Sequence, residues 1–267
     1  MASTLEGEWA LILGASSGFG AACARALAEA GMNIFGVHLD LRATLPHAQQ
    51  VEADIEALGR QAIFFNTNAA DDRKRARVLG KMEDALQASS PPRYVGVMLH
   101  SLAFGTLLPF IADDPTDAIR RAQMEMTLDV MAHSLVYWVQ DLVRRGMLRR
   151  GSKVFSMTSA GSHKVVGGYG AVSAAKAALE SHTRQLAMEL APLGICVNCV
   201  QAGVTDTPAM RKIPNSDRLL AEAMARNPSG RITETEDVAR VVVALSDPDI
   251  TQINGTVICV DGGEDIV

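Results

Sequence analysis

Short apolar runs alternate with longer amphipathic segments along the whole chain, and this alternation restricts the fold more than any other feature. Runs of strand length lie at 9–14, 33–39, 61–68, 94–101, 152–159, 195–203 and 255–263. Segments with helical spacing separate them, at 20–31, 47–59, 71–87, 115–145, 171–194 and 236–247, and the fourth of these is long enough for one helix or two. The run at 94–101 is apolar almost throughout, which is typical of a strand that helices cover on both faces. Because no hairpin signal joins the runs, the pattern predicts an α/β fold, a parallel sheet with helices on both faces.

A single domain accounts for the chain of 267 residues, which contains no linker or low-complexity tract. We therefore treat residues 1–267 as one domain. The segment 205–230 interrupts the alternation, and loops of this length often close over or bind a ligand. We expect it to be the substrate-binding loop, with a helix around residues 216–225.

Charge and hydropathy narrow the range of partners. The formal net charge is −5 and the isoelectric point is about 5.7, so the chain lacks the broad basic field of a nucleic-acid-binding protein. Its first residues lack the basic stretch and long apolar core of a signal peptide. No apolar run approaches the ~18 residues of a membrane-spanning helix. We expect a cytoplasmic protein without a nucleic-acid or membrane partner.

Cys196 and Cys199 form a C-x-x-C motif, which raises the question of a metal or redox site. The motif lies in the strand-like stretch GICVNCV, and residues three apart on a strand point to opposite faces. No second cysteine pair accompanies it. We therefore expect reduced, buried cysteines and no metal site.

A glycine-rich turn follows the first strand, in the stretch LILGASSGFG. Gly14, Gly18 and Gly20 stand between an apolar run and an alanine-rich helical segment. Glycine lets the backbone approach a pyrophosphate closely, and the following helix N-terminus favours anions. This context predicts a dinucleotide site, whereas a glycine cluster alone would indicate only a tight turn.

Four motifs in this order carry a family resemblance: GASSGFG, AAKAALESHTRQLAMELAPLGICVN, AGVTDTP and the terminal VDGG. Together they resemble the short-chain dehydrogenase/reductase superfamily over nearly the whole chain, from about residue 9 to residue 263. The resemblance implies a Rossmann-type, doubly wound sheet of seven strands and, commonly, a homotetramer. It also implies a set of cofactor-binding residues: Gly14, Ser16, Ser17, Phe19 and Gly20 around the phosphates, Asn68 and Ala69 at the adenine, Ser101, Leu102 and Ala103 at the nicotinamide ribose, and Thr205 and Thr207 at the carboxamide and pyrophosphate.

The choice between NADPH and NADH depends on the tip of the second strand. Enzymes that use NAD tend to have a carboxylate there, bonded to the ribose hydroxyls. Here that position is His38, with Asp40 two residues on and Arg42 beyond. An imidazole and a guanidinium suit a 2′-phosphate, so we expect NADPH. NADH is the alternative, because Asp40 suits a ribose and Arg42 is equally consistent with a solvated loop charge.

The stretch YGAVSAAK places Tyr169 seven residues before Lys176, with Val172 in the slot four residues before the lysine. Seven residues are two helical turns, so both side chains can face one cofactor, about 10 Å apart along the axis against about 6 Å for a spacing of four. Reduction of a carbonyl needs an acid beside the carbon that accepts hydride. Conjugate reduction of a C=C bond develops charge on a carbonyl oxygen two carbons away, which a displaced hydroxyl can meet.

The same spacing, together with HSLAFG at residues 100–105, is similar to the enoyl-acyl-carrier-protein reductase branch of the superfamily. That resemblance implies that Tyr169 donates to the enolate oxygen of an enoyl thioester and that Lys176 binds the nicotinamide ribose. It implies a weaker, orienting role for Ser159, ten residues before the tyrosine. Phe104 and Gly105 are the expected substrate contacts.

Two alternative functions stay open. A carbonyl or hydroxysteroid-type oxidoreductase of the same superfamily would have a tyrosine where this chain has Val172. A non-catalytic NAD(P)-sensing protein would tolerate loss of Tyr169 or Lys176. Asp129 stands where many members have an asparagine for a proton relay, so that relay is not assumed.

The expected substrate is an acyl-carrier-protein thioester, and carrier proteins are acidic. Arg211, Lys212 and Arg218 in the long loop form a candidate docking patch near the expected entrance. Exposed loop charges also occur without a partner. His133 and His182 lie on apolar helical segments and are interpreted as packing or interface residues.

Overall fold

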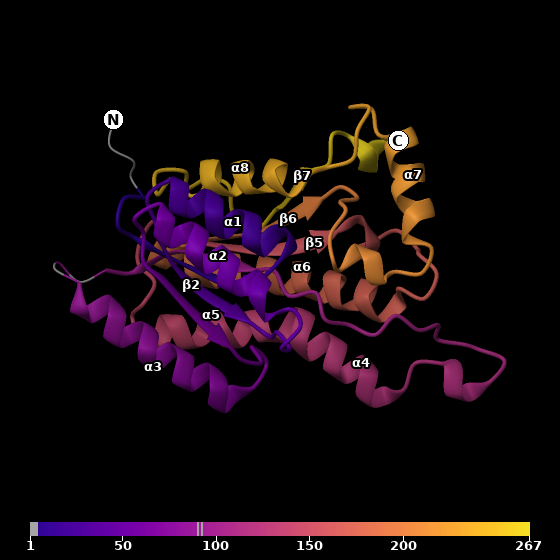
Figure 1. Cartoon of the computed structure of the whole chain (residues 1–267), viewed down its shortest axis with the longest axis horizontal. Helices are drawn as coiled ribbons and strands as arrows, with labels where there is room; N and C mark the ends of the chain where they lie inside the picture. Colours follow the sequence, from indigo (N-terminus) through magenta and orange to yellow (C-terminus); the bar gives the residue numbers. More distant parts are fainter. Residues whose placement is uncertain (1–4, 90, 92) are drawn as a thin grey trace.

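A computed structural model describes residues 5–89, 91 and 93–267 as one parallel α/β sheet structure (Figure 1). Within these residues the sheet has seven strands in the order β3-β2-β1-β4-β5-β6-β7. Every neighbouring pair is parallel. The strands are β1 (Trp9–Leu13), β2 (Asn33–His38), β3 (Ala62–Asn66), β4 (Val95–His100), β5 (Lys153–Ser159), β6 (Cys196–Ala202) and β7 (Val257–Val260). The predicted doubly wound sheet of seven strands is confirmed.

Helices cover both faces of this sheet. One face carries α1 (Gly18–Glu29), α2 (Leu45–Ala57) and α8 (Thr235–Leu245), which pack together in the upper layer of Figure 1. The other face carries α3 (Asp72–Ala88), α4 (Arg121–Leu128), α5 (Ser134–Arg144) and α6 (Gly170–Leu190). The two layers bury separate apolar clusters, so the sheet is covered from both sides.

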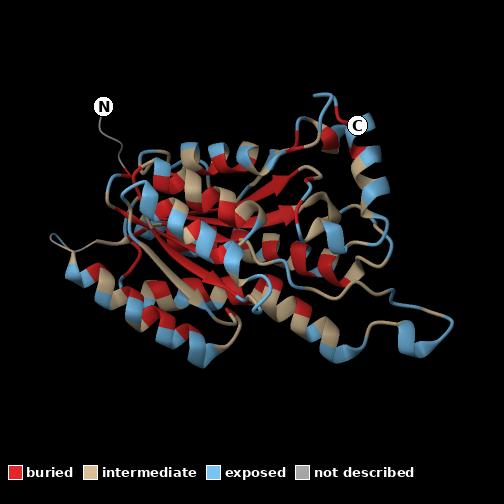
Figure 2. Cartoon of the chain, in the orientation of Figure 1, coloured by how far each residue is buried: buried red, intermediate tan, exposed pale blue. Residues whose placement is uncertain are grey.

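The side chains of β1 alternate between the two faces of the sheet, so this strand contributes to both apolar clusters. Leu11 and Leu13 pack into the cluster under α3, α5 and α6, whereas Ala10 and Ile12 pack under α1 and α8. Successive side chains of a strand point to opposite faces, so an apolar strand contributes to both cores. The central strands in Figure 2 are accordingly buried along their length.

The segment 115–145 contains two α-helices rather than one. A 3-10 turn at Pro115–Asp117 precedes α4, and a π-helical segment, Asp129–His133, joins α4 directly to α5. Inside this junction the Ser134 hydroxyl donates to the Val130 carbonyl. Such side-chain bonds to the helix backbone compete with regular helical pairing, and π-helical turns are often found at functional sites.

The long loop 205–230 is partly helical. A 3-10 turn at Met210–Lys212 and helix α7 (Ser216–Arg226) lie within it, so the helix expected around residues 216–225 is confirmed. Asn215 precedes α7 with φ 60°, a left-handed conformation that asparagine tolerates. In the part of the chain that the structure describes, no helix is both long enough and apolar enough to cross a membrane.

Candidate active site

The glycine-rich turn lies where the sheet order reverses, between the C-terminal ends of β1 and β4. A Cβ on Gly14 would lie 2.5 Å from the carbonyl oxygen of Ser101, and Gly14 has φ +93°. A Cβ on Gly20 would lie 2.0 Å from the carbonyl oxygen of Gly14. The backbone packs too closely at both positions for a side chain, so glycine is required there. The turn then leads into the N-terminus of α1. The residues present fit the phosphates of a dinucleotide.

Thr207 lies opposite this turn. A Cβ on Gly18 would be 3.6 Å from the Thr207 side chain, although the two residues are far apart in sequence. Thr207 is buried, and its hydroxyl accepts from the Met210 amide at 3.2 Å. Thr205 is also buried, and its hydroxyl donates to the Gly203 carbonyl. The start of the long loop is thus held against the turn, as the implied pyrophosphate role of Thr207 requires.

The other implied cofactor residues lie along the same edge of the sheet. The Ser101 amide donates to the Leu13 carbonyl at 2.8 Å, which ties β4 to β1. Leu102 is partly buried, whereas Ala103 and Ser17 are exposed, and Phe19 packs against the core under α1. The Asn68 side chain accepts from the Ala70 amide, and the Ala69 carbonyl accepts from Trp138 Nε1 at 2.9 Å. These bonds hold the loop after β3 in place.

At the tip of β2, His38 is buried, and its Nδ1 lies 2.8 Å from Asp40 Oδ2. Burial acts to raise the pKa of Asp40, but hydrogen bonds from Thr44, Ser16 and His38 outweigh it, so the pKa lies below its usual value. Asp40 is therefore ionised and largely engaged within the protein. Arg42 is exposed and makes no hydrogen bond or ion pair with another described residue.

Tyr169 immediately precedes α6, as its N-cap residue, and lies beside the end of β5. Its hydroxyl is 3.5 Å from Ser159 Oγ, so the structure brings two of the expected catalytic residues together. Burial raises the pKa of Tyr169, which the hydrogen bond to Ser159 partly offsets. The phenol is protonated at neutral pH and available as a hydrogen-bond donor.

Lys176 lies two turns further along α6 with its side chain buried, 6% exposed. Its Nζ donates to the Met157 carbonyl at 2.6 Å. Burial lowers the pKa of Lys176 to about 8, while Cys199 and Glu180 act in the opposite direction. A lysine in such a position is close to losing its proton in the neutral range.

Val172 occupies the slot of the tyrosine in a four-residue spacing, and it is buried. A Cβ on Gly105 would lie 2.8 Å from Val172 Cγ2 and 2.9 Å from Met131 Sδ. Val172 therefore fills space against the loop that follows β4. Of the two expected substrate residues, Gly105 lies in this packed region, whereas the Phe104 side chain is 57% exposed.

Two residues near the candidate catalytic groups were not predicted from the sequence. Gly161 is one: a Cβ there would lie 2.5 Å from Tyr169 Cε1, so only glycine leaves room for the ring. Glu180 is another, since its Oε1 accepts from the Thr158 hydroxyl at 2.6 Å. The placement of Gly161 two residues after Ser159 was the available signal. No local pattern marked Glu180.

Three histidines lie near the π-helical segment that contains Asp129. His100 is fully buried, its Nε2 lies 2.8 Å from Ser134 Oγ, and burial lowers its pKa to about 3, so it is neutral. His133 Nδ1 lies 3.0 Å from His182 Nε2, which agrees with packing roles for these two residues. Asp129 opens the π-helical segment.

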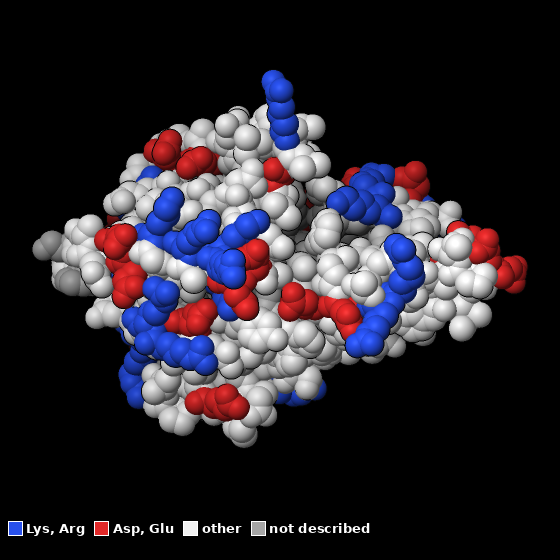
Figure 3. All heavy atoms as spheres, turned by 90° about the horizontal axis from the view of Figure 1, so that it is seen from below, with Lys and Arg blue, Asp and Glu red and all other residues white. Residues whose placement is uncertain are grey.

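The candidate docking patch is largely neutralised within the long loop. Arg211 forms ion pairs with Asp206 and Asp217, and Arg218 pairs with Glu222. Lys212 is exposed, and its side chain has no hydrogen-bond or ion-pair partner among the described residues. On the face seen in Figure 3, Lys and Arg side chains gather with Asp and Glu among them at the end that holds α3, and not at the long loop.

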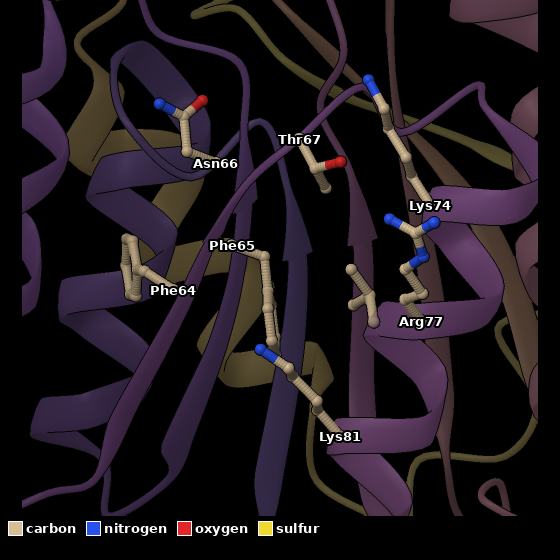
Figure 4. A pocket seen from close by; sticks show the side chains of 8 residues that line it. Phe64, Phe65, Asn66, Thr67, Lys74, Arg77 and Lys81 are labelled. Carbon is tan, nitrogen blue, oxygen red and sulfur yellow. The ribbon is translucent and has the colours of Figure 1, made fainter.

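Neither of two surface pockets is lined by the tyrosine, and one of them adjoins the glycine-rich turn. One is a groove of about 390 Å³ between β3 and α3, where Phe65 and Thr67 face Lys74, Arg77 and Lys81 (Figure 4). The other lies against Ser16, Ser17 and Gly18 of the glycine-rich turn. Tyr169 itself packs closely against Gly161.

The cysteines of the C-x-x-C motif have different neighbours. Cys196 Sγ donates to the carbonyl of Thr251, whereas Cys199 Sγ lies 3.1 Å from Ser156 Oγ and 3.2 Å from Thr183 Oγ1. Both are free and buried. The prediction that they point to opposite faces of the strand is confirmed.

A family model described as Enoyl-(Acyl carrier protein) reductase matches residues 14–264. The chain belongs to the short-chain dehydrogenase/reductase superfamily. The resemblance drawn from the sequence motifs is thereby confirmed, and the protein is an oxidoreductase of this superfamily.

Similar proteins within the superfamily catalyse more than one reaction. The L-xylulose reductase of Bos taurus is 28% identical over 262 residues, which are 97% of this chain and 97% of that protein. The NADH enoyl-(acyl-carrier-protein) reductase FabI of Buchnera aphidicola subsp. Baizongia pistaciae is 31% identical over 168 residues, 63% of this chain and 64% of that protein. A solved structure of a short chain dehydrogenase from Burkholderia cenocepacia J2315, in complex with NADP, is 29% identical, with a TM-score of 0.81 over 98% of this chain and 99% of that one. These likenesses do not separate C=C from C=O reduction.

Proposed function

We propose that the protein reduces the C=C bond of an enoyl thioester, as an enoyl-acyl-carrier-protein reductase of fatty-acid synthesis. The observation that carries the proposal is the displaced position of the tyrosine: Tyr169 stands at the start of α6, and Val172 is packed into the slot nearer to Lys176. A hydroxyl at that displaced position suits a carbonyl oxygen two carbons from the reduced carbon. The match to a family model described as an enoyl reductase supports the same reaction.

The proposed cofactor is NADPH, with NADH as the alternative. Bound in the site, the nicotinamide supplies the hydride. The glycine-rich turn binds the phosphates, as the close approach of Gly14, Gly20 and Thr207 supports. Arg42 is the proposed contact for a 2′-phosphate because its guanidinium has no partner among the described residues, whereas Asp40 is engaged by His38 and Ser16. The NADP in the similar structure from Burkholderia cenocepacia supports this choice.

The protein's own groups have separate roles in this reaction. Tyr169 donates a hydrogen bond to the thioester oxygen and stabilises the charge that develops there, because its pKa lies above the usual value and the phenol keeps its proton. Ser159 orients the tyrosine hydroxyl or the substrate carbonyl. Lys176 binds the nicotinamide ribose, and its positive charge stabilises the developing negative charge. Gly105 and Phe104 are the proposed substrate contacts.

A carbonyl reductase is the second candidate, and one observation favours it. Ser159 lies where ordinary superfamily reductases have their catalytic serine, and its Oγ is within reach of the Tyr169 hydroxyl. The likeness to L-xylulose reductase extends over nearly the whole chain, which supports the same alternative. A non-catalytic NAD(P)-sensing protein is the third candidate, and it requires neither hydroxyl.

Turnover with matched substrates tests the proposal. We would follow NAD(P)H absorbance with a crotonyl thioester and with a panel of ketones and sugars that includes L-xylulose, for the wild type and Tyr169→Phe. We expect enoyl turnover that falls by about 10²–10³-fold in the variant, in the range of general acid–base contributions. Ketone or sugar turnover without enoyl turnover would overturn the proposal. No turnover with any substrate, together with tight cofactor binding, would favour the sensing protein.

The proposed setting is the cytoplasm, with an acyl-carrier-protein thioester as the substrate and a homotetramer as the assembly. The acidic carrier would approach the long loop, where Lys212 is the cation without an intramolecular partner among the described residues. Light scattering of the purified protein tests the tetramer.

A further inference from the structure

Three consecutive residues at the end of β5 contact the helix that carries the proposed catalytic pair. The Met157 carbonyl accepts from Lys176 Nζ at 2.6 Å, and the Thr158 hydroxyl donates to Glu180 Oε1 at 2.6 Å. Ser159 Oγ is 3.5 Å from the Tyr169 hydroxyl. Lys176 and Glu180 are four residues apart on α6, so their side chains leave the same face of the helix. One strand end therefore anchors three groups of this helix, of which Glu180 has no role in the reaction proposed above.

Among the described residues, Glu180 is the acidic side chain that raises the pKa of the buried Lys176. Cys199 and Glu180 are the groups that would raise the pKa of Lys176 against the effect of burial. Burial raises the pKa of the Cys199 thiol itself, so Cys199 is neutral at physiological pH and contributes no charge. Glu180 is partly exposed and is the remaining negative charge that acts on the lysine.

Other titratable groups near Lys176 and Glu180 come from the strands and helical segments around α6. His100 of β4 is buried and neutral, and Cys259 of β7 is a thiol whose pKa is raised by burial and by nearby acids. The π-helical segment contributes Asp129 and His133, of which His133 bonds to His182 further along α6. Tyr169 keeps its proton because burial raises its pKa. Cys199 and Glu180, and none of these groups, are the neighbours that raise the pKa of Lys176.

We propose that Glu180 is a positioning residue, whose carboxylate is held by Thr158 and preserves the positive charge with which Lys176 binds the nicotinamide ribose. The inference rests on the proposed function, since it takes Lys176 as the ribose-binding cation. It adds that the positive charge of Lys176 depends on an acidic residue, Glu180, one helical turn further along α6. It concerns cofactor binding, so it can be measured without any assumption about the substrate.

The test is the pH dependence of the cofactor dissociation constant, measured by NADPH and NADH fluorescence without substrate. Affinity should fall as the pH rises through the pKa of Lys176, because the cation is lost. Glu180→Gln keeps a side chain that can accept from Thr158 but removes the charge, so the fall should move to lower pH by about one unit. Thr158→Val frees the carboxylate without removing it, and we expect a smaller shift in the same direction.

Glu189→Gln is the matched control, because Glu189 is an exposed carboxylate on the same helix and contacts only Gln185 among the described residues. It should leave the pH profile unchanged. Glu180→Asp keeps the charge and should restore most of the wild-type profile. A merely structural role for Glu180 would change stability or affinity at all pH values without moving the profile along the pH axis.

Lys176→Ala separates failure of this inference from failure of the proposed function. This variant should abolish the alkaline fall in affinity. If Lys176→Ala abolishes the fall but Glu180→Gln leaves it in place, the role of Glu180 is wrong and the proposed function survives. If Lys176→Ala keeps the wild-type fall, the role of Lys176 itself is wrong and the inference falls with it. Should Glu180→Gln not fold by circular dichroism, an unshifted profile for Thr158→Val overturns the inference.

Discussion

At the scale of single residues, the position of the proposed proton donor depends on a glycine that is not itself reactive. A Cβ on Gly161 would lie 2.5 Å from Tyr169 Cε1 and 3.2 Å from Ser159 Oγ. Real side chains do not approach this closely, so an added methyl group would displace the ring from Ser159. Misplacement of a reacting group by about 1 Å can reduce a rate by about 10²-fold.

We predict that Gly161→Ala lowers kcat by at least about tenfold and leaves the dissociation constant of the cofactor nearly unchanged. Steady-state kinetics and cofactor titration measure the two effects. Gly167→Ala is the control in the same connection, because a Cβ at Gly167 has no heavy atom within 4 Å. Equal kinetic effects of the two substitutions would contradict the specific role of Gly161.

The choice of cofactor is also decided by single residues at the tip of β2. Arg42 is exposed without a partner among the described residues, whereas Asp40 is ionised and bonded to His38. We predict that Arg42→Ala raises KM for NADPH by about tenfold or more, since hydrogen bonds between charged groups contribute about 1.5–3 kcal/mol. KM for NADH should not change.

Initial rates over a range of both cofactors measure this prediction. Arg73→Ala removes an equally exposed arginine from α3 and serves as the control. A wild-type protein that strongly prefers NADH would contradict the NADPH assignment whatever the variant does.

At the scale of elements, the π-helical segment Asp129–His133 connects the sheet to the helix layer. The Ser134 hydroxyl, at its end, donates to the Val130 carbonyl and lies 2.8 Å from His100 Nε2 at the end of β4. His100 is fully buried, and burial lowers its pKa to about 3. A neutral imidazole in this position needs its polar partner, because an unpaired buried polar group is costly.

We predict that Ser134→Ala lowers the free energy of unfolding by about 1–3 kcal/mol, the penalty for a buried polar atom that loses its partner. Urea unfolding measures the change, and an unaltered slope with denaturant would show that the folded state has kept its compactness. Ser181→Ala, at an exposed position of α6, should stay within about 0.5 kcal/mol of the wild type. If the two variants are equally stable, the bond to His100 does not stabilise the fold.

At the scale of the whole molecule, the parallel sheet collects the ends of β1, β4, β5 and β6 at one edge, and the long loop lies over that edge. Three of the four cations of this loop are already paired within the protein: Arg211 with Asp206 and Asp217, Arg218 with Glu222, and Arg226 with Glu264. An acidic carrier protein would therefore find Lys212 rather than a continuous basic patch. The charge on the carrier would act mainly on the rate of association.

We predict that Lys212→Glu raises KM several-fold for acyl-carrier-protein thioesters and leaves KM for coenzyme A thioesters unchanged. Kinetics with both substrate forms at low and moderate salt measure the difference. Lys74→Glu, which reverses an exposed charge in the groove between β3 and α3, is the control. Similar effects on both substrate forms would contradict docking at the long loop.

The sequence alone determined the architecture of this protein, and it indicated the candidate residues of the site. The period of the apolar pattern specifies strands and helices locally, and parallel strands leave their C-terminal ends at one edge. Gly14, Tyr169 and Lys176 could therefore be predicted from their positions relative to strand ends. The spacing of Tyr169 and Lys176 depends only on helix geometry, which is the same in any protein.

Only the tertiary structure decided which side chains form hydrogen bonds or ion pairs within the protein. The side chains of Asp40 and Arg211 are paired with other side chains, whereas those of Arg42 and Lys212 are not. Such pairing depends on which side chains the folded loops bring together, and the order of residues does not specify this. Gly161 packs against the Tyr169 ring, and Glu180 accepts a hydrogen bond from Thr158, so both contacts join separate elements. These contacts join residues that are 8 and 22 positions apart, and only Gly161, two residues after Ser159, had a signal in the sequence. Sequence periodicity specifies which face a residue occupies, whereas packing between elements specifies its neighbours on that face.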